Sequence, residues 1–193
     1  MGAVIVATPQ DWAPYTSVED AAKVYLRDPD IAIDQMRGVV DYRTVDAFIM
    51  SRGTNQESWG EALWQEVVLT DTRRLILWRG TDEMRTAQDR EQRRTLDASV
   101  RSIQLSSITD QILTEEFEVL DDGTRRLSAM YLRLYTQLLT RSFQKSVTDT
   151  NFYCESFRYH KSVENGGLAQ MERLIQFGRV LSRAMRIGKG EGS

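Results

Sequence analysis

Two β-prone runs flank a short polar turn in the segment Val68-Leu69-Thr70-Asp71-Thr72-Arg73-Arg74-Leu75-Ile76-Leu77-Trp78. Aliphatic, β-branched and aromatic side chains favour extended backbone, and a two-residue polar connection between them favours an antiparallel hairpin. The segment therefore predicts two paired strands, over 60–70 and 73–79. An antiparallel sheet is accordingly expected in the middle of the chain.

Five more segments are strand-like on either side of this hairpin, which brings the predicted total to seven strands. They cover residues 43–51, 100–105, 111–119, 125–135 and 152–160. Alternation along 125–135 places Met130, Leu132 and Leu134 on the buried face. Asp121-Asp122-Gly123 is predicted as a tight turn, in which glycine supplies the positive φ. Two stretches are predicted as connections: Gly53-Thr54-Asn55 and the highly charged segment 81–98.

The last regular element is predicted as an amphipathic helix over Leu168–Ile187, ended by Gly188. It contains no proline, and its apolar residues recur at helical spacing: Met171, Leu174, Ile175, Gly178, Leu181 and Met185. Burial of each large side chain of this stripe is worth about 1.5–3 kcal/mol, so the helix is expected to dock on the sheet. Residues 188–193 are expected to form a disordered tail.

The first 42 residues are predicted as an N-terminal, partly helical extension. All three prolines lie within the first 30 residues. Ser17 resembles a helix N-cap, because the acidic residues Glu19 and Asp20 follow it in the first turn. Pro29 is expected to end that helix, because the residue before a proline is pushed out of the helical region. The extension is expected either to dock on the main domain, residues 43–187, or to pack on another subunit.

Seven strands followed by one C-terminal amphipathic helix resemble the order of a pleckstrin-homology-like (PH-like) domain. The hairpin Val68–Trp78 is similar to the leucine-threonine, turn, arginine-leucine hairpin of bacterial PH-like and GRAM domains, and Ser102–Ile108 is similar to the strand that follows it. The resemblance covers residues 43–187. It implies an α+β fold, namely a seven-stranded antiparallel, partly open barrel capped by the C-terminal helix.

Composition disfavours several classes of protein. The 193 residues carry 25 basic and 28 acidic side chains, a net charge of −3, which argues against a dedicated nucleic-acid binder. One cysteine, Cys154, and one histidine, His160, cannot form a zinc site of the usual Cys/His kind, so neither a metal nor a cofactor is expected. The single cysteine fits a reducing, cytoplasmic compartment. The longest apolar run, residues 3–7, is far too short to cross a bilayer, which takes about 20 residues.

Six residues are predicted to contact a partner or a lipid: Arg73, Arg74, Trp78, Arg79, Arg93 and Arg94. Exposed aromatic residues at a sheet edge are typical of protein contacts, and each cationic side chain adds about 1 kcal/mol at an anionic membrane surface. The first hypothesis is a non-enzymatic module that binds a protein partner, or a second copy of itself, through its sheet edges and the N-terminal extension. Peripheral attachment to the inner face of the membrane is the alternative.

An enzyme is a third hypothesis, and it depends on His160 as the base. Cys154 and His160 are six residues apart on one predicted strand, roughly 20 Å by strand rise, which is too far for a direct dyad. The chain has no Gly-x-Ser-x-Gly elbow. Gly166-Gly167 is not followed by the Lys-Ser/Thr of a phosphate-binding loop. No catalytic residue is therefore predicted.

Overall fold

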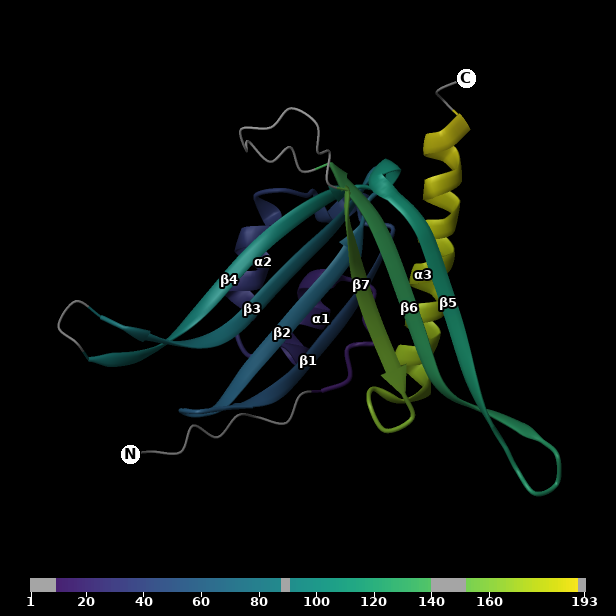
Figure 1. Ribbon diagram of the computed structural model, residues 1–193, viewed down its shortest axis with the longest axis horizontal. Helices are drawn as coiled ribbons and strands as arrows, with labels where there is room; N and C mark the ends of the chain where they lie inside the picture. The colour runs from purple at the N-terminus through teal and green to yellow at the C-terminus, as the bar shows by residue number, and fades with distance from the viewer. Residues whose placement is uncertain (1–9, 88–90, 140–151, 191–193) are drawn as a thin grey trace. The chain divides into compact units, whose positions relative to one another are not determined.

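The chain folds into helices and antiparallel sheets that divide between two compact units (Figure 1). The computed structural model describes residues 10–87, 91–139 and 152–190. The first unit ends at Ser102 and contains a four-stranded sheet, whereas the second begins at Ile103 and contains a three-stranded sheet and the C-terminal helix. The predicted α+β class, with antiparallel sheets and a C-terminal helix, is confirmed.

The four-stranded sheet has the order β1-β2-β3-β4. Its strands are β1 (Ala47–Glu57), β2 (Gly60–Thr70), β3 (Arg74–Thr86) and β4 (Gln92–Gln104). The bounds of β2 agree with the prediction. Ile49 pairs with Val68, and Val68 pairs with Leu77, so aliphatic residues lie side by side across three strands. All three are buried, which places part of the core of the first unit in this half of the sheet.

Two segments predicted as connections lie in strands instead. Gly53-Thr54-Asn55 belongs to β1. In the charged segment 81–98, residues 81–86 form the end of β3 and residues 92–98 form the first half of β4, and residues 88–90 lie outside the described part of the chain. Opposite charges contribute to the pairing of β3 with β4, since Arg85 contacts Asp97 at 3.0 Å. The prediction was wrong because strands paired through charged side chains lack the apolar alternation that marks a half-buried strand.

Two glycines of this sheet make room for tryptophan rings. Gly53 pairs with Trp64, and a Cβ at Gly53 would lie 2.9 Å from the Trp64 ring. On β3, a Cβ at Gly80 would lie 2.8 Å from the ring of Trp78 and 3.2 Å from Leu96 on β4. Each ring therefore occupies the volume that a side chain at the glycine position would need.

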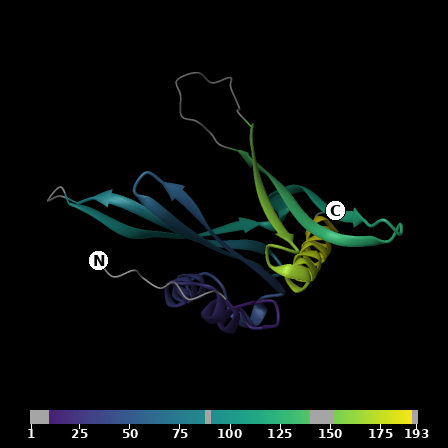
Figure 2. The same cartoon turned by 90° about the horizontal axis from the view of Figure 1, so that it is seen from below.

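The N-terminal extension forms two helices that cover one face of the four-stranded sheet (Figure 2). The helix α1 (Val18–Tyr25) begins at the predicted cap, where Ser17 Oγ accepts a hydrogen bond from the N–H of Asp20 at 3.3 Å. The helix α2 spans Pro29–Arg37. Pro29 therefore begins a helix, and α1 already ends at Tyr25. The prediction for Pro29 was wrong because proline is favourable in the first turn of a helix, where the N–H group that it lacks would have no partner within the helix.

Both helices bury their apolar residues within the first unit. Trp12, just before α1, is fully buried, and its ring centroid lies 5.7 Å from that of Phe48 on β1. Met36 of α2 is also fully buried, and Gln35 of α2 accepts a hydrogen bond from the indole N–H of Trp78 at 2.8 Å. The extension thus docks on its own chain. The domain boundary predicted between residues 42 and 43 stays a prediction.

Replacing Ser17 by alanine is expected to lower the free energy of unfolding by about 1 kcal/mol, because an N–H group in the first turn of α1 loses its acceptor. Denaturant unfolding followed by far-UV circular dichroism measures this loss. Ser17→Asp is the matched control, since a carboxylate caps a helix about as well as a hydroxyl does. Equal losses in both variants would show that the cap does not stabilise α1.

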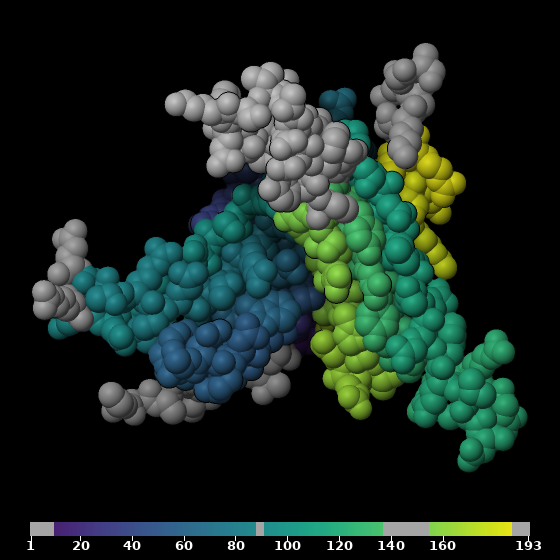
Figure 3. All heavy atoms as spheres, viewed as in Figure 1, coloured from purple at the N-terminus to yellow at the C-terminus, as the bar shows by residue number. Residues whose placement is uncertain are grey.

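The second unit contains a three-stranded antiparallel sheet in the order β5-β6-β7. Its strands are β5 (Ile108–Val119), β6 (Arg125–Leu139) and β7 (Phe152–Ser162), and the 3₁₀ turn η2 (Leu105–Ser107) precedes them. Met130, Leu132 and Leu134 are fully buried, as predicted. Because β7 ends at Ser162 opposite Ala129, β5 and β6 continue beyond it as a two-stranded ribbon, whose tip projects in Figure 3.

The C-terminal helix α3 (Gly167–Gly190) packs on this sheet. Its fully buried apolar residues are Met171, Leu174, Phe177 and Leu181. All of them except Phe177 belong to the predicted stripe. Gly178 allows a close approach to β5, since a Cβ at this position would lie 3.3 Å from Gln111 and from Leu113. Its carbonyl oxygen accepts a hydrogen bond from Gln111 Nε2 at 2.8 Å. The helix includes residues 188–190, which corrects the tail predicted there, because a single glycine such as Gly188 weakens a helix without ending it.

Candidate functional site

A cluster of polar side chains lies where the linker between α1 and α2 meets the four-stranded sheet. We name it the Arg27–Asp82 cluster, and its members are Arg27, Asp28, Gln65, Asp82 and Arg94. The carboxylate of Asp82, 2% exposed, is at its centre. Arg27 donates to both oxygens, at 2.8 and 2.7 Å, the N–H of Leu63 donates at 3.1 Å, and Arg94 donates a further hydrogen bond. Four hydrogen bonds therefore converge on one carboxylate.

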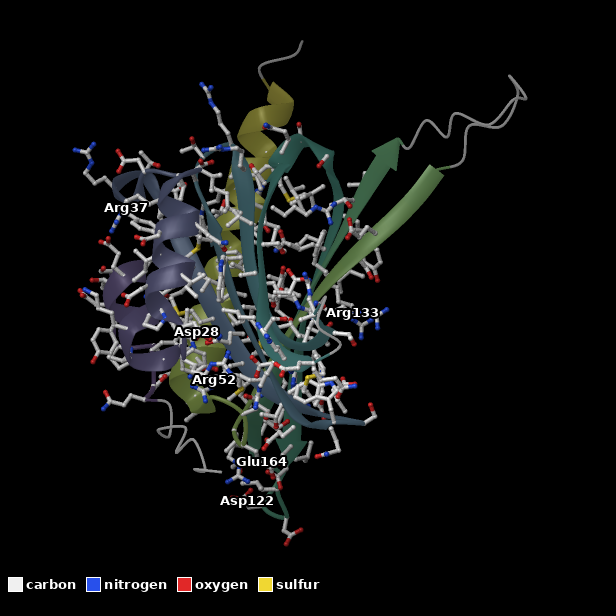
Figure 4. The ribbon with its side chains drawn as sticks, turned by 90° about the vertical axis from the view of Figure 1, so that its left-hand side faces the viewer. Asp28, Arg37, Arg52, Asp122, Arg133 and Glu164 are labelled. Atoms are coloured by element: carbon white, nitrogen blue, oxygen red, sulfur yellow. The ribbon has the colours of Figure 1, made fainter. Side chains whose placement is uncertain are left out.

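Gln65 on β2 joins the backbone of the linker to this cluster. Its buried Oε1 accepts hydrogen bonds from the N–H of Arg27 at 2.6 Å and from that of Asp28 at 3.3 Å, and its Nε2 donates to Asp28 Oδ2 at 2.7 Å. On β1, Arg52 donates to the carbonyl oxygen of Tyr25 at 2.9 Å. Figure 4 shows Asp28 and Arg52 at this junction of helices and strands. The linker is thus held by side chains from three strands.

Hydrogen bonding explains why a carboxylate is ionised at this depth. Burial raises the pKa of Asp82, but the hydrogen bonds from Arg27, Arg94 and the N–H of Leu63 together outweigh burial and lower the pKa to about 2. The hydrogen bond with Asp82 in turn raises the pKa of Arg27. Both groups are charged at neutral pH, and a carboxylate with so low a pKa is a poor general base. The Arg27–Asp82 cluster can fix the linker, but it is not suited to proton transfer.

Arg94 connects this cluster to the outer strand of the sheet. It extends from β4, and half of its side chain is exposed. Besides Asp82, it donates to the carbonyl oxygen of Glu61 at 3.1 Å and lies over the ring of Trp59, 5.4 Å from the centroid. Such a cation–π contact is worth about 0.5–1 kcal/mol at an exposed site. Arg94 therefore fixes β4 against the hairpin formed by β1 and β2.

The strand β4 forms an open edge of the four-stranded sheet. Among the described residues it pairs with β3 alone, and Figure 1 shows it along the border of the sheet. Most of the strand is exposed. Four of its side chains are half-buried: Thr95, Leu96, Ala98 and Val100. An edge strand presents N–H and C=O groups to which another extended segment can add. We therefore treat β4 as the candidate binding surface.

The strand β5 is also at an edge of its sheet, but it suits strand addition less well. Its pairing with β6 shifts in register between Ile108 and Asp110 and again between Glu116 and Phe117. Such irregularities twist an edge and interrupt its ladder of hydrogen bonds. Glu116 and Glu118 also add like charges to one stretch of the strand. β4 carries charges of both signs and is the better acceptor.

Two of the six predicted contact residues, Trp78 and Arg74, are buried or half-buried. Trp78 was wrongly predicted as a contact residue, because it is fully buried and donates its indole N–H to Gln35. The face of β3 that carries Trp78 is the face that α2 covers, and the sequence pattern did not reveal this. Arg74 is half-buried and contacts Asp71 at 2.8 Å across the turn between β2 and β3.

The four remaining predicted residues are exposed, and they lie in the turn before β3, on β3 and on β4. Arg73 lies in the turn before β3 and Arg79 lies on β3, and both are exposed. Arg93 contacts Glu91 at 3.1 Å, and Arg94 belongs to the Arg27–Asp82 cluster. A role of these arginines in binding stays a prediction.

A shallow groove of about 620 Å³ lies beside α1 and α2. Its lining mixes charged and apolar residues: Glu19, Arg37, Val39, Val40, Asp41, Tyr42 and Arg43. Arg37 contacts Glu19 at 2.8 Å, and Arg43 contacts Asp41 at 2.7 Å. Burial raises the pKa of Tyr42 to about 12, so this phenol is neutral under ordinary conditions. The charged groups of the groove thus pair with one another.

His160, on which the enzyme hypothesis depends, is exposed on β7. Its ring stacks on that of Tyr131 in β6, with centroids 4.5 Å apart, and the hydroxyl of Tyr131 donates to Glu116 at 3.2 Å. The side chain of Cys154 lies outside the described residues. An exposed stack of this kind stabilises neighbouring strands, and it adds no support to the enzyme hypothesis.

Arg27, Gln65 and Asp82 were not predicted as site residues, although one signal was present. Asp82 alternates with Trp78 and Gly80 along β3, so it falls on the same, buried face of the strand. A buried carboxylate requires a partner. That partner is Arg27, 55 residues earlier in the chain, and local patterns do not reach so far.

Metal-site geometry, membrane-spanning helices and similarity to known proteins add no further assignment for the described part of the chain. Within residues 10–87, 91–139 and 152–190, no group of three or more His, Cys, Asp or Glu is placed to hold a metal ion. Among the helices in these ranges, none combines the length and the apolar character needed to cross a membrane. Comparisons with protein-family models, curated proteins and solved structures found no match to the chain.

Proposed function

We propose that the chain is a non-enzymatic, PH-like interaction module that binds an extended segment of a protein by strand addition along β4. The observation that carries this proposal is the open edge of β4. In strand addition, backbone hydrogen bonds provide affinity, and contacts with alternate side chains provide selectivity. The half-buried residues Leu96 and Val100 would contact those side chains.

The order of the elements supports the PH-like part of the proposal. A four-stranded antiparallel sheet precedes a three-stranded one, and α3 follows as the last helix. This order is similar to that of PH-like domains, in which a C-terminal helix closes one end of a partly open barrel. The packing of α3 on the sheet of β5, β6 and β7 supports the same assignment.

The docking of α1 and α2 favours the sheet edge over the N-terminal extension as the binding surface. The apolar residues of both helices are buried in the first unit. The membrane alternative has less support, because Arg74 and Arg94 are held by Asp71 and Asp82. Sedimentation with anionic vesicles tests that alternative, and salt-sensitive binding to the vesicles would favour it.

Proline at one of two neighbouring positions of β4 is expected to abolish binding without unfolding the chain. Successive N–H groups of a strand point to opposite sides, so one of the pair Ser99 and Val100 donates toward β3 and the other toward the open edge. Proline removes the N–H group, and edge strands tolerate proline where that group faces solvent. Ser99→Pro and Val100→Pro therefore form a matched pair of variants.

The full-length chain is immobilised and exposed to native lysate of the cells that produce it, and captured proteins are quantified by mass spectrometry. Thermal unfolding identifies which proline variant keeps the wild-type midpoint, because the other variant breaks the pairing of β4 with β3. Loss of the captured proteins in the variant with the unchanged midpoint is the expected result. Undiminished capture in that variant would contradict strand addition at β4.

A further inference from the structure

We propose that the segment added at β4 is the β4 strand of a second copy of this chain, so that two copies form one continuous sheet across a two-fold axis. This inference rests on the proposed function and names the partner. A two-fold axis makes the interface self-complementary, because residue i of one copy faces residue j of the other and j also faces i. Two edge strands related by such an axis run antiparallel, as the neighbouring strands β2 and β3 already do.

The charges of β4 complement one another when the axis passes at Ser99. In that register Asp97 of one copy lies opposite Arg101 of the other, and symmetry forms this pair twice. Both residues are two positions from Ser99, so their side chains point to the same face of the continued sheet. Directly opposite side chains have Cβ atoms about 4.5–5.5 Å apart, and opposite charges at that spacing stabilise a strand pair.

Neighbouring registers lack this complementarity. With an axis at Ala98, Asp97 of one copy lies opposite Ser99 of the other, two positions away from Arg101 of that copy. An axis at Asp97 itself places Arg93 opposite Arg101, and like charges directly opposite each other are destabilising. An axis at Ser99 leaves Arg93 beyond the paired stretch, which covers residues 94–104.

The apolar residues of the strand fit the same register. Ala98 lies opposite Val100, again twice, and both residues are half-buried in the single chain. Pairing of the two strands removes further apolar surface of these residues from water, which favours association. The backbone of the edge gains interstrand hydrogen bonds at the same time.

Both charged residues are accessible for this contact. The side chain of Asp97 is 48% exposed and contacts Arg85 at 3.0 Å. Arg101 is exposed and has five N–H donors, so it can keep a contact within its own chain while it donates to Asp97 of the second copy. A carboxylate has two oxygens with about four acceptor positions. Asp97 can therefore keep its contact with Arg85 on β3 while it accepts a hydrogen bond from Arg101 of the second copy.

Exchange of the two charges tests the inference on the full chain. Asp97→Arg makes both symmetric contacts repulsive, and so does Arg101→Asp. Each single variant is expected to weaken self-association by about tenfold, as measured by analytical ultracentrifugation over a concentration series at low salt. The double variant D97R/R101D is expected to associate as the wild type does. An equimolar mixture of the two single variants is expected to form a heterodimer, because every contact across its interface joins opposite charges.

A matched control separates the register from net charge. Arg93→Asp changes the net charge by the same amount as Arg101→Asp, but position 93 lies outside the paired stretch, so its self-association is expected to stay within twofold of the wild type. Thermal unfolding of each variant shows whether the fold is retained. In the wild type, hydrogen exchange at the amides of 96–102 is expected to slow as the protein concentration rises.

Two results would overturn the inference. One is a wild-type chain that stays monomeric over the whole concentration series, and the other is a dimer that neither single charge exchange weakens. In either case, loss of captured protein in the folded proline variant would still support strand addition to a different protein. If capture were also undiminished in the folded proline variant, the proposed function itself would be contradicted.

Discussion

Replacing Trp78 by alanine is expected to lower the free energy of unfolding by about 4 kcal/mol, the largest effect predicted for this chain. The side chain is fully buried, and its ring fills the space above Gly80 between β3 and the helices. Its indole N–H donates to Gln35 of α2 at 2.8 Å. Alanine at this position leaves a cavity in the core, and it also leaves Oε1 of Gln35 without its hydrogen-bond donor.

Urea unfolding followed by circular dichroism measures this loss. Trp78→Phe is the matched control, because it keeps an aromatic ring in the core but removes the indole N–H. Loss of one such hydrogen bond, with a small change in packing, is expected to cost about 1–2 kcal/mol. If alanine cost no more than phenylalanine, the ring would not be an essential part of the core.

Asp82→Ala is expected to lower the free energy of unfolding by about 3 kcal/mol. Removing one partner of a buried ion pair typically costs about 3–5 kcal/mol, because the other charge is left uncompensated. The lower end of this range applies because Arg27 and Arg94 are 25% and 50% exposed and can turn toward water. Urea unfolding is again the measurement.

Glu118→Ala provides a comparison at the surface. Glu118 contacts Arg126 at 2.5 Å across the β5–β6 hairpin, but both side chains are about half exposed or more. Its removal is expected to cost less than about 1 kcal/mol. Similar losses for Asp82→Ala and Glu118→Ala would show that the Arg27–Asp82 cluster contributes no more than an exposed pair does.

The lowered pKa of Asp82 also predicts how stability depends on pH. The ordinary value of 3.8 applies to the unfolded chain, and the folded value is about 2. A carboxyl group whose pKa is lower in the folded state stabilises the fold above its unfolded pKa, and this contribution is lost as the pH falls through the folded pKa. The contribution of Asp82 is therefore expected to be complete above about pH 4 and to fade toward about pH 2. In Asp82→Asn this part of the decline should disappear, and identical profiles for the two proteins would contradict the assignment.

Local signals in the sequence predicted the elements that depend on nearby residues. The hairpin of β2 and β3 follows from a polar turn between β-prone runs, and α3 follows from apolar residues at helical spacing. The N-cap Ser17 is recognisable for the same reason, since its partner Asp20 lies three residues away. Such signals act within one turn of a helix or one pair of strands.

The features that the sequence did not reveal depend on distant partners. The segment 81–98 is rich in charged residues, and its strands become apparent only when contacts such as Arg85 with Asp97 are known. The face of β3 that carries Trp78 is buried because α2, far earlier in the chain, covers it. Asp82 has the same dependence, since its partner Arg27 comes from the linker between two helices.

The two glycine–tryptophan pairs of the first sheet have a consequence for evolution. The ring of Trp64 fills the space that a side chain at position 53 would need, and the ring of Trp78 fills the space that a side chain at position 80 would need. In a divergent sequence with the same fold, a larger residue at either glycine position should therefore be accompanied by a smaller one at the paired tryptophan position. This coordinated variation of two pairs of positions gives a means of recognising distant relatives whose overall sequence similarity has been lost.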